Sequence, residues 1–285
     1  MEVIRKPYHF LKYRLLRNFQ RAVDFRLARR ELSYSHALSE HERRLLADVS
    51  VRIDLDDGMY AGSASSYLRV GLSALRAIEL ALAEAAKPIA EVRAILDFPS
   101  GYGRVLRFLK VRFPAAAITV SEIDGKALEF CRRTFSVQAT PSHERLRELE
   151  DIGRFDLVWC GSLITHVDRD ATANLLAFFR RQLGPGGVCV VTTHGPRSAE
   201  WIEARTETYR LSPAAQRELL AQFHQGGYGY VDYERRRGYG VSLISRQRML
   251  EIAAGVGNWR NACYLEHGWA EHQDVYAFVA DDTEL

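Results

Sequence analysis

The chain has 285 residues, of which 47% are hydrophobic and 26% charged. These ordinary globular values exclude wholesale disorder, a collagen-like repeat and a disulfide miniprotein. The formal net charge is only +3, but residues 1–30 hold nine Lys and Arg against Glu2 and Asp24, so the basic character belongs to the N-terminus. Four widely spaced cysteines with no CxxC pair argue against a zinc site or a disulfide framework, and we see no metal-ligand cluster.

No apolar run approaches the ~18 residues of a membrane span, and the N-terminus has no uninterrupted apolar stretch of the signal-peptide kind. We therefore expect a reduced, cytoplasmic protein.

The first 90 residues predict a helical N-terminal extension and cap. Residues 5–30 form a helical pattern, because apolar residues recur every three or four positions. This apolar stripe comprises Tyr8, Leu11, Leu15, Phe19, Val23 and Leu27. Ser39 and Glu42 form a capping-box pattern that predicts a second helix start. Residues 54–62 read as a loop, and a third helix over 65–87 ends before Pro88.

The basic helix has four interpretations. Its stripe can pack on its own domain, lie on an anionic membrane surface or a membrane-bound partner, face nucleic-acid phosphates, or form a dimer contact. Nucleic acid is disfavoured because the remaining chain is slightly acidic. The sequence leaves the oligomeric state open.

From residue 91 onward the pattern changes to alternating strands and helices. The predicted strands cover 94–98, 118–122, 136–140, 155–161 and 188–194. Continuous apolar strands that alternate with helices indicate a parallel sheet covered on both faces. The last third predicts a helix at 212–224, a Gly/Tyr-rich stretch at 226–240 and a strand at 241–245. It then predicts a helix at 246–255 and strands at 261–267 and 274–280 that pair antiparallel at a sheet edge.

The residues with the clearest chemistry are 95–104, ILDFPSGYGR. Gly101 and Gly103 follow a buried strand and open a helix, where backbone N–H groups can approach a ligand. The third glycine of a dinucleotide fingerprint is absent. Glu122 ends the next strand, where a carboxylate can accept hydrogen bonds from ribose hydroxyls. Together these features predict a ligand that contains a nucleoside.

This segment resembles the first motif of class I S-adenosylmethionine-dependent methyltransferases, with Pro99 in place of its first glycine. SEIDGKALEFC, FDLVWCGSLITHVD and LGPGGVCVVTTHG resemble the family's next motifs in order. The resemblance implies an α/β, Rossmann-like, seven-stranded sheet with an antiparallel last strand over residues 91–285. It also implies S-adenosylmethionine as cofactor and S-adenosylhomocysteine as product. The cofactor-binding candidates are Asp97, Ser100, Gly101, Tyr102, Gly103, Glu122, Ile123, Cys160, Gly161, Ser162 and Tyr67.

His166 is the catalytic candidate, since it lies just beyond the fourth strand and has an ordinary pKa suited to a general base. His194 after the fifth strand is a weaker candidate. His267 and His272 are expected to be structural, and Gln273 and Asp274 to pin a strand. The Cys160 thiol is expected to be a small buried hydrophobe.

Two flanking segments can complete the site. Residues 57–71 form a candidate lid, from which Tyr60 and Tyr67 can reach cofactor or acceptor or simply pack on the sheet. Residues 226–240 can form an acceptor wall, because aromatic faces bind rings and Arg binds anions. The wall residues are Tyr228, Tyr230, Tyr233 and Arg235–Arg237, although consecutive arginines are often only a solvated surface.

We expect a methyltransferase that acts on an oxygen of a small molecule or glycan, with His166 as candidate base. N-methylation of a small molecule is the alternative within this class. The strand-four motif typical of methyltransferases that act on amino groups of bases is absent, which disfavours those acceptors. A nicotinamide-dependent oxidoreductase and a non-catalytic subunit that binds the cofactor are alternatives from other classes.

Overall fold

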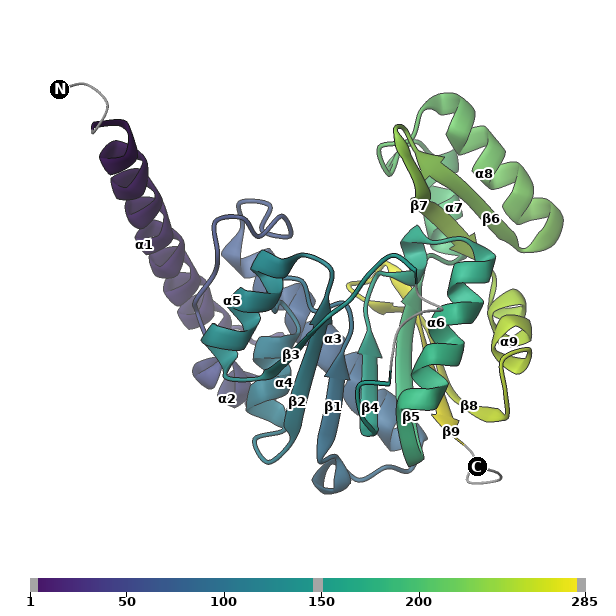
Figure 1. Ribbon diagram of the computed structural model, residues 1–285, viewed down its shortest axis with the longest axis horizontal. Coiled ribbons are helices and arrows are strands. Elements are labelled where there is room, and N and C mark those ends of the chain that lie inside the picture. Colours follow the sequence, from purple (N-terminus) through teal and green to yellow (C-terminus); the bar gives the residue numbers. More distant parts are fainter. Residues whose placement is uncertain (1–4, 146–150, 281–285) are drawn as a thin grey trace.

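The centre of the molecule is a seven-stranded sheet with strand order β3-β2-β1-β4-β5-β9-β8 (Figure 1). The structure is a computed structural model that describes residues 5–145 and 151–280. The strands of the sheet are β1 (Ala94–Asp97), β2 (Ala117–Glu122), β3 (Gln138–Pro141), β4 (Phe155–Cys160), β5 (Leu183–Thr193), β8 (Trp259–Trp269) and β9 (Gln273–Ala280). Strands β1 to β5 are parallel, whereas β9 is antiparallel to both of its neighbours. The predicted sheet and its antiparallel late strands are thus confirmed.

Helices cover both faces of this sheet, as the continuous apolar strands predict. The helices are α1 (Arg5–Ser33), α2 (Glu40–Asp48), α3 (Ala64–Glu84), α4 (Leu106–Arg112), α5 (Gly125–Phe135), α6 (Arg169–Gln182), α7 (Pro196–Glu203), α8 (Pro213–Gly226) and α9 (Arg246–Ala254), with short 3-10 turns η1 (Ile89–Glu91) and η3 (Ile164–His166). Successive β5 side chains alternate between the two faces, so that Val188 and Val190 join one core while Cys189 and Val191 join the other.

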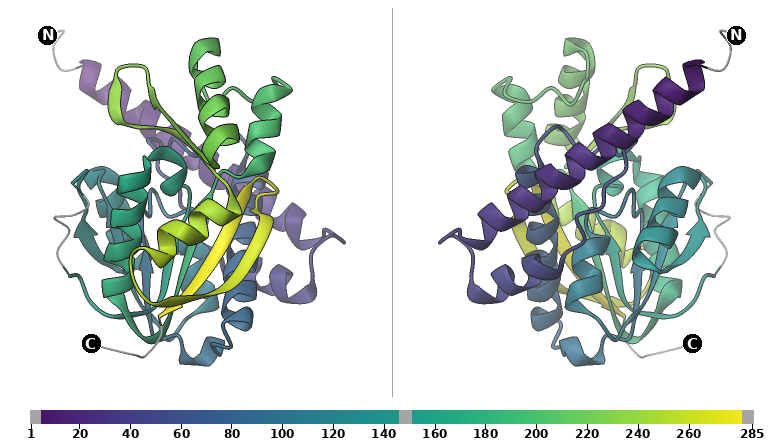
Figure 2. Two further views of the ribbon diagram at one scale, coloured as in Figure 1. Left: turned by 90° about the vertical axis from the view of Figure 1, so that its right-hand side faces the viewer. Right: turned by 90° about the vertical axis from the view of Figure 1, so that its left-hand side faces the viewer.

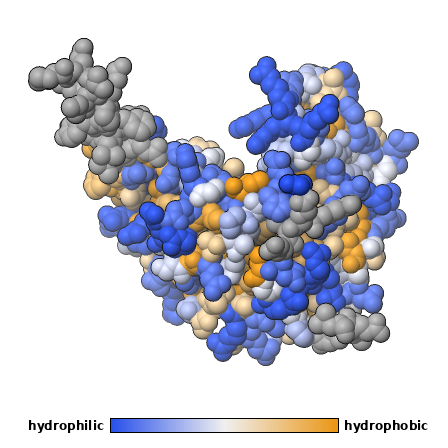
Figure 3. All heavy atoms as spheres, viewed as in Figure 1, coloured by the Kyte–Doolittle hydropathy of each residue, from blue (hydrophilic) through white to orange (hydrophobic). Residues whose placement is uncertain are grey.

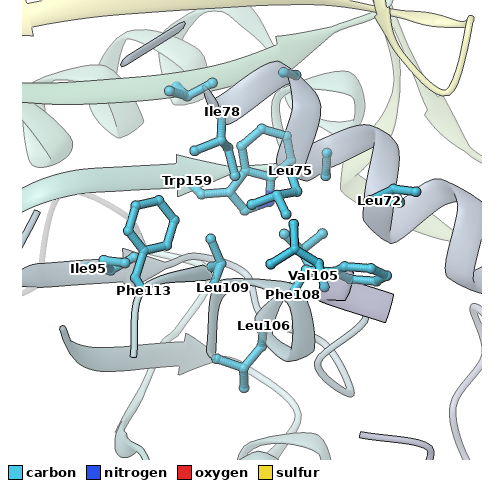
Figure 4. Close-up of a cluster of buried hydrophobic side chains, with 14 of the residues drawn as sticks. Leu72, Leu75, Ile78, Ile95, Val105, Leu106, Phe108, Leu109, Phe113 and Trp159 are labelled. Carbon is cyan, nitrogen blue, oxygen red and sulfur yellow. The ribbon is translucent and has the colours of Figure 1, made fainter. Parts of the chain in front are cut away.

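The first core lies between the sheet and helices α3 and α4 (Figure 4). Leu72, Leu75 and Ile78 of α3 point toward Leu109 of α4 and Trp159 of β4. All five side chains are almost completely buried. The second core lies on the opposite face, under α6 and α9.

Arg107 of α4 joins the N-terminal cap to the sheet. Its Nη1 donates to the carbonyl oxygens of Ser50 at 2.8 Å and Arg52 at 3.1 Å, and its Nε donates to that of Gly103 at 3.0 Å. Its guanidinium also lies 5.1 Å from the ring centre of Tyr67. A buried cation is costly unless it is hydrogen-bonded, so these carbonyls hold the cap and the loop after β1 in one arrangement.

Helix α1 forms over the predicted residues, but it packs through a different face. Phe25, Ala28 and Leu32 are buried, whereas Phe19 and Leu27 of the predicted stripe are 68% and 59% exposed. For these two residues the first of the four interpretations, packing of the stripe on the chain's own domain, does not hold. The physical reason is that the segment 49–54 also binds the arginine side of the helix. Arg21 Nη1 donates to Asp54 O at 2.7 Å, and Arg29 Nη1 donates to Val49 O at 3.1 Å. The side chains of Tyr8, Leu11 and Leu15 lie outside the described residues.

The segment between β5 and β8 builds a separate lobe. Strands β6 (Tyr228–Tyr233) and β7 (Arg236–Ile244) form a two-stranded antiparallel sheet against α7 and α8. The predicted Gly/Tyr-rich loop at 226–240 is therefore largely a β-hairpin, and the predicted strand at 241–245 is the end of β7. Figure 2 shows the lobe above the ends of the main strands. In the described part of the chain no helix is long and apolar enough to span a membrane.

Candidate active site

The loop between β1 and α4 packs against α5. Gly101 and Gly103 have φ angles of +50° and +77°, a left-handed region that side chains other than glycine rarely adopt. A Cβ atom on Gly103 would lie 2.7 Å from Cε2 of Phe135, whereas one on Gly101 would meet no atom within 4 Å. Gly103 is thus needed for packing, and Gly101 keeps backbone accessible beside open space.

Glu122 ends β2 and reaches across to this loop. Its Oε2 accepts a hydrogen bond from Gly101 N at 2.7 Å, and its Oε1 accepts from Ile123 N at 2.8 Å and Asp124 N at 3.1 Å. Oε1 already accepts two hydrogen bonds, whereas Oε2 accepts one and can accept a second, so Glu122 retains capacity for one hydroxyl of a ligand. The structure therefore brings the predicted glycine loop and acidic residue into direct contact.

Asp97 lies at the end of β1 and is completely buried. Its Oδ2 has no hydrogen-bond partner among the described residues. Burial raises the pKa of this carboxyl well above the ordinary aspartate value, and the nearby Glu122 carboxylate adds to the rise. The site thus holds an acid that a bound cation would ionise and pair.

A hollow of about 470 Å³ lies beside Ile123, which is 56% exposed. Its other lining residues are His143, Glu144 and Arg145, from the segment after β3. Sequence reasoning missed this segment because it contains no glycine or acidic motif. The parallel pairing of β2 with β3 is the signal that could have placed it at the same sheet edge.

Two predicted loop residues make contacts that hold the loop in place. Ser100 N donates to Ser121 O at 3.1 Å, which attaches the loop to β2. Tyr102 packs on Phe130 of α5 with ring centres 5.8 Å apart, and burial raises the pKa of its phenol.

Three predicted residues follow one another at the end of β4. A Cβ atom on Gly161 would lie 2.9 Å from Cζ2 of Trp159, which leaves no room for a side chain. Ser162 N donates to Thr192 Oγ1 at 2.8 Å, and Gln273 Nε2 donates to Ser162 Oγ at 3.1 Å. Gln273 thus pins β4 and β5 to β9, as predicted. Burial raises the pKa of the Cys160 thiol, so it stays a neutral hydrophobe.

His166 lies beyond β4 in η3 and is oriented by the lobe. Its Nδ1 lies 2.8 Å from Gly240 O, which can only accept, so Nδ1 carries the proton and Nε2 is free to accept one. Its ring stacks on Tyr239 at 4.9 Å between centres, and the Tyr233 hydroxyl lies 3.3 Å from Nδ1. Burial lowers the pKa of His166 below its ordinary value, against the effect of the Gly240 hydrogen bond.

Strand β7 crosses the ends of two main strands. Ser242 Oγ donates to Ile164 O at 2.6 Å, and Ile244 N donates to His194 O at 2.8 Å. Because His166 also bonds to β7, the lobe fixes the imidazole relative to the sheet. Tyr239 and the backbone of Gly240 were missed by sequence reasoning, which expected a loop there.

A stack of rings lies beside His166, centred on His194 and His272. Their ring centres are 5.0 Å apart, and Trp201 stacks on His272 at 4.7 Å. Tyr209 Oη lies 2.5 Å from His272 Nε2, and the ring centre of Tyr209 lies 4.6 Å from that of His194. Burial lowers the pKa of His194 well below the ordinary value, and the neighbouring imidazoles His272 and His166 lower it further. Trp201 and Tyr209 were also missed, because α7 was not predicted.

Some of the predicted lid and wall residues contact the site, and the others make only structural contacts. Tyr67 is buried, and its hydroxyl donates to Asp57 Oδ2 at 2.6 Å. Tyr60 lies under Arg21, at 4.5 Å from ring centre to guanidinium carbon. Of the predicted wall tyrosines, Tyr233 reaches His166. Tyr228 instead donates to Val167 O at 3.1 Å, and Tyr230 to Asp232 Oδ1 at 2.7 Å. Arg104 lies between the rings of Tyr67 and Trp269.

The four cysteines are free and buried. Asp274, expected to pin a strand, accepts from His267 N at 2.9 Å and from Tyr264 Oη at 3.0 Å. No group of three or more His, Cys, Asp or Glu within residues 5–145 and 151–280 could hold a metal ion.

Residues 95–187 match a family model described as a methyltransferase domain. No curated protein shows significant sequence similarity to the chain. Among solved structures, the sugar N-methyltransferase KedS8 from Streptoalloteichus aligns with 16% identity and a TM-score of 0.54, over 80% of this chain and 94% of that one. An S-adenosylmethionine-dependent methyltransferase from Clostridium acetobutylicum aligns with 11% identity and a TM-score of 0.51, over 79% and 96% of the two chains.

The mitomycin 7-O-methyltransferase MmcR aligns with 14% identity and a TM-score of 0.50, over 88% of this chain. The chain spans only 60% of MmcR and 56% of the pyocyanin biosynthetic protein PhzM. At these identities the structural likeness concerns the fold.

Proposed function

The chain has a methyltransferase domain over residues 95–187 and the fold of the class I S-adenosylmethionine-dependent methyltransferases, and we propose that it methylates an oxygen of a small molecule or glycan. S-adenosylmethionine is the cofactor that this domain indicates. The observation that carries the proposal is the orientation of His166, whose Nδ1 hydrogen bond to Gly240 O leaves an unprotonated Nε2 beside the end of β4.

The residues present suit this cofactor. Glu122 Oε2 has acceptor capacity for one ribose hydroxyl, and the exposed Ile123 offers an apolar surface for an adenine ring in the hollow beside it. Asp97 has an unpaired buried oxygen that a methionyl ammonium group would satisfy. The cofactor would supply an electrophilic methyl group, so the chain itself has only to align an acceptor and exclude water.

His166 would accept the hydroxyl proton of the acceptor as the methyl group transfers. Its lowered pKa keeps it neutral near pH 7, and this neutral form is the one that can take a proton. The rings of Tyr239 and Tyr233 would hold the imidazole in place and provide flat apolar surface for the acceptor.

The first test is calorimetric titration with S-adenosylmethionine and S-adenosylhomocysteine. We expect micromolar binding that Glu122→Gln weakens about 10- to 100-fold, since hydrogen bonds to a charged group contribute about 1.5–3 kcal/mol. Glu129→Gln is the matched control, because Glu129 pairs only with exposed arginines of its own helix. Binding of NAD in place of either sulfur ligand would refute the proposal.

A panel of hydroxylated and amino sugars and small molecules then distinguishes O- from N-methylation through release of S-adenosylhomocysteine. Turnover of amino acceptors alone would favour the N-methyltransferase alternative. Tight cofactor binding without turnover of any acceptor would favour the non-catalytic alternative.

A further inference from the structure

Helix α1 carries an apolar stripe on the side turned away from the body. Leu16, Phe19 and Leu27 are 59%, 68% and 59% exposed, and Val23 lies between them at helical spacing. Phe25 and Leu32, on the opposite side, are the residues that pack into the core. Three large exposed apolar side chains on one helix face indicate an interaction surface rather than an isolated exposed residue.

The same helix is strongly basic. Within Arg5–Ser33 the sequence has nine Lys and Arg against Asp24 and Glu31. Arg21 and Arg29 are bound to backbone carbonyls of the body, whereas Arg26 and Arg30 are exposed on the outer side, next to the stripe. An exposed apolar stripe beside exposed arginines is the arrangement of helices that lie in the interface of anionic membranes.

The orientation of this helix agrees with such a surface. Figures 1 and 2 both show the N-terminal part of α1 and the β6–β7 hairpin rising on the same side of the molecule, above the site. The tip of the hairpin carries the exposed residues Arg235–Arg237. Figure 3 shows the outline of the molecule hollowed between α1 and this lobe. The N-terminal part of α1 and the tip of the hairpin are therefore on one side of the molecule, while the stripe itself faces away from the body.

We propose that the outer face of α1, formed by Leu16, Phe19, Val23, Leu27, Arg26 and Arg30, docks on an anionic lipid surface. The positive charge of the helix distinguishes between the possible binding partners of this face. A second copy would bring two strongly basic helices together, whereas anionic headgroups attract both the helix and the hairpin arginines. Nucleic-acid phosphates would attract the arginines but leave the apolar stripe exposed. This inference does not depend on the proposed reaction.

The test is co-sedimentation of the full chain with vesicles of phosphatidylcholine alone or mixed equally with phosphatidylglycerol. We expect binding to the mixed vesicles only, lost at about 1 M salt, where the Debye length falls to roughly 3 Å. Phe19→Ser/Leu27→Ser should reduce the vesicle affinity at least tenfold, because two apolar side chains lose their burial in the interface. Arg26→Glu/Arg30→Glu should reduce it by a similar factor.

The matched control is Leu80→Ser, which removes an apolar side chain that is 52% exposed on α3, outside the candidate lid. Circular dichroism and S-adenosylmethionine binding of each variant separate a folding defect from a docking defect. Equal binding to neutral vesicles, unchanged binding of both α1 variants, or an equal loss in the control would each overturn the proposal. So would a concentration-dependent dimer that Phe19→Ser/Leu27→Ser abolishes, since the occupant would then be a second copy.

Discussion

The two edges of the site are built by different means. The proposed cofactor edge, from β1 to β3, uses short loops, backbone amides and two buried carboxylates, Asp97 and Glu122. The acceptor edge, beyond β4 and β5, uses stacked rings and neutral imidazoles held by an inserted lobe. A cofactor that is the same in every enzyme of a class can be bound by a few backbone positions in a constant sequence order. An acceptor specific to one enzyme instead needs side-chain surfaces that differ from protein to protein.

The difference extends to protonation. Burial raises the pKa of Asp97, so the neutral acid is the favoured form at the cofactor edge. Burial lowers the pKa of His166 and His194, so the neutral base is the favoured form at the acceptor edge. Both edges are therefore poised to become charged when a ligand provides the partner.

The largest expected effect is that of a substitution at the acceptor edge, which should lower turnover without weakening cofactor binding. His166→Gln should lower kcat about 10²–10⁴-fold through loss of the general base, and leave S-adenosylmethionine affinity within twofold to threefold of the original. The measurement is S-adenosylhomocysteine release with the acceptor found by screening, beside calorimetry. His224→Gln, at an exposed histidine on α8, is the control. Equal losses of turnover and cofactor affinity would show that the two edges are not separable.

A smaller effect is expected from Asp97→Asn, which should stabilise the free protein and weaken cofactor binding. The raised pKa means that the stabilising neutral form of Asp97 is complete below the unfolded pKa and lost as pH rises through the folded pKa. At neutral pH the amide should therefore raise the melting temperature by a few degrees, while cofactor affinity falls about tenfold.

Calorimetry and thermal unfolding with and without S-adenosylmethionine measure both effects, with the exposed Asp170→Asn as control. A lower melting temperature of the free protein would instead assign Asp97 a structural capping role.

The smallest effect concerns pH and the acceptor edge. Because the folded pKa of His194 is depressed, its contribution to stability is complete above the unfolded value near 6.5 and declines as pH falls toward the folded value. The free energy of unfolding, and with it the melting temperature, should fall between pH 7.5 and 5, by up to about 1.4 kcal/mol for each tenfold reduction in proton affinity. His194→Phe keeps an aromatic ring and should flatten this profile. An unchanged slope in that variant would assign the pH response to other groups.

Most of the sheet and the cofactor edge could be predicted from the sequence, because their signals are local. The apolar run before Asp97, the two glycines and the acidic end of the next strand each specify a backbone position that parallel pairing then brings together. A helix also follows the second predicted strand, as the alternating pattern indicates, and it is α5 (Gly125–Phe135).

The acceptor edge could not be predicted in the same way. The positions of Tyr239 and Gly240 relative to His166 depend on how β7 crosses the sheet, and no local pattern encodes this. The packing face of α1 could not be predicted for a related reason. Both sides of the helix carry apolar residues, and the carbonyl oxygens of Val49 and Asp54 determine which side is buried by accepting hydrogen bonds from Arg29 and Arg21.

The position of β9 has a consequence for synthesis. This strand lies between β5 and β8, is buried along its whole length, and pairs Val188 with Val279. A ribosome that adds about 5–20 residues per second needs several seconds to pass from β5 to β9. Throughout that interval β5 is paired with β4 on one edge only, and the edge that β9 will pair has no strand beside it. The nascent chain must therefore shield this edge by other means, through its own lobe or a chaperone, until its final strand arrives.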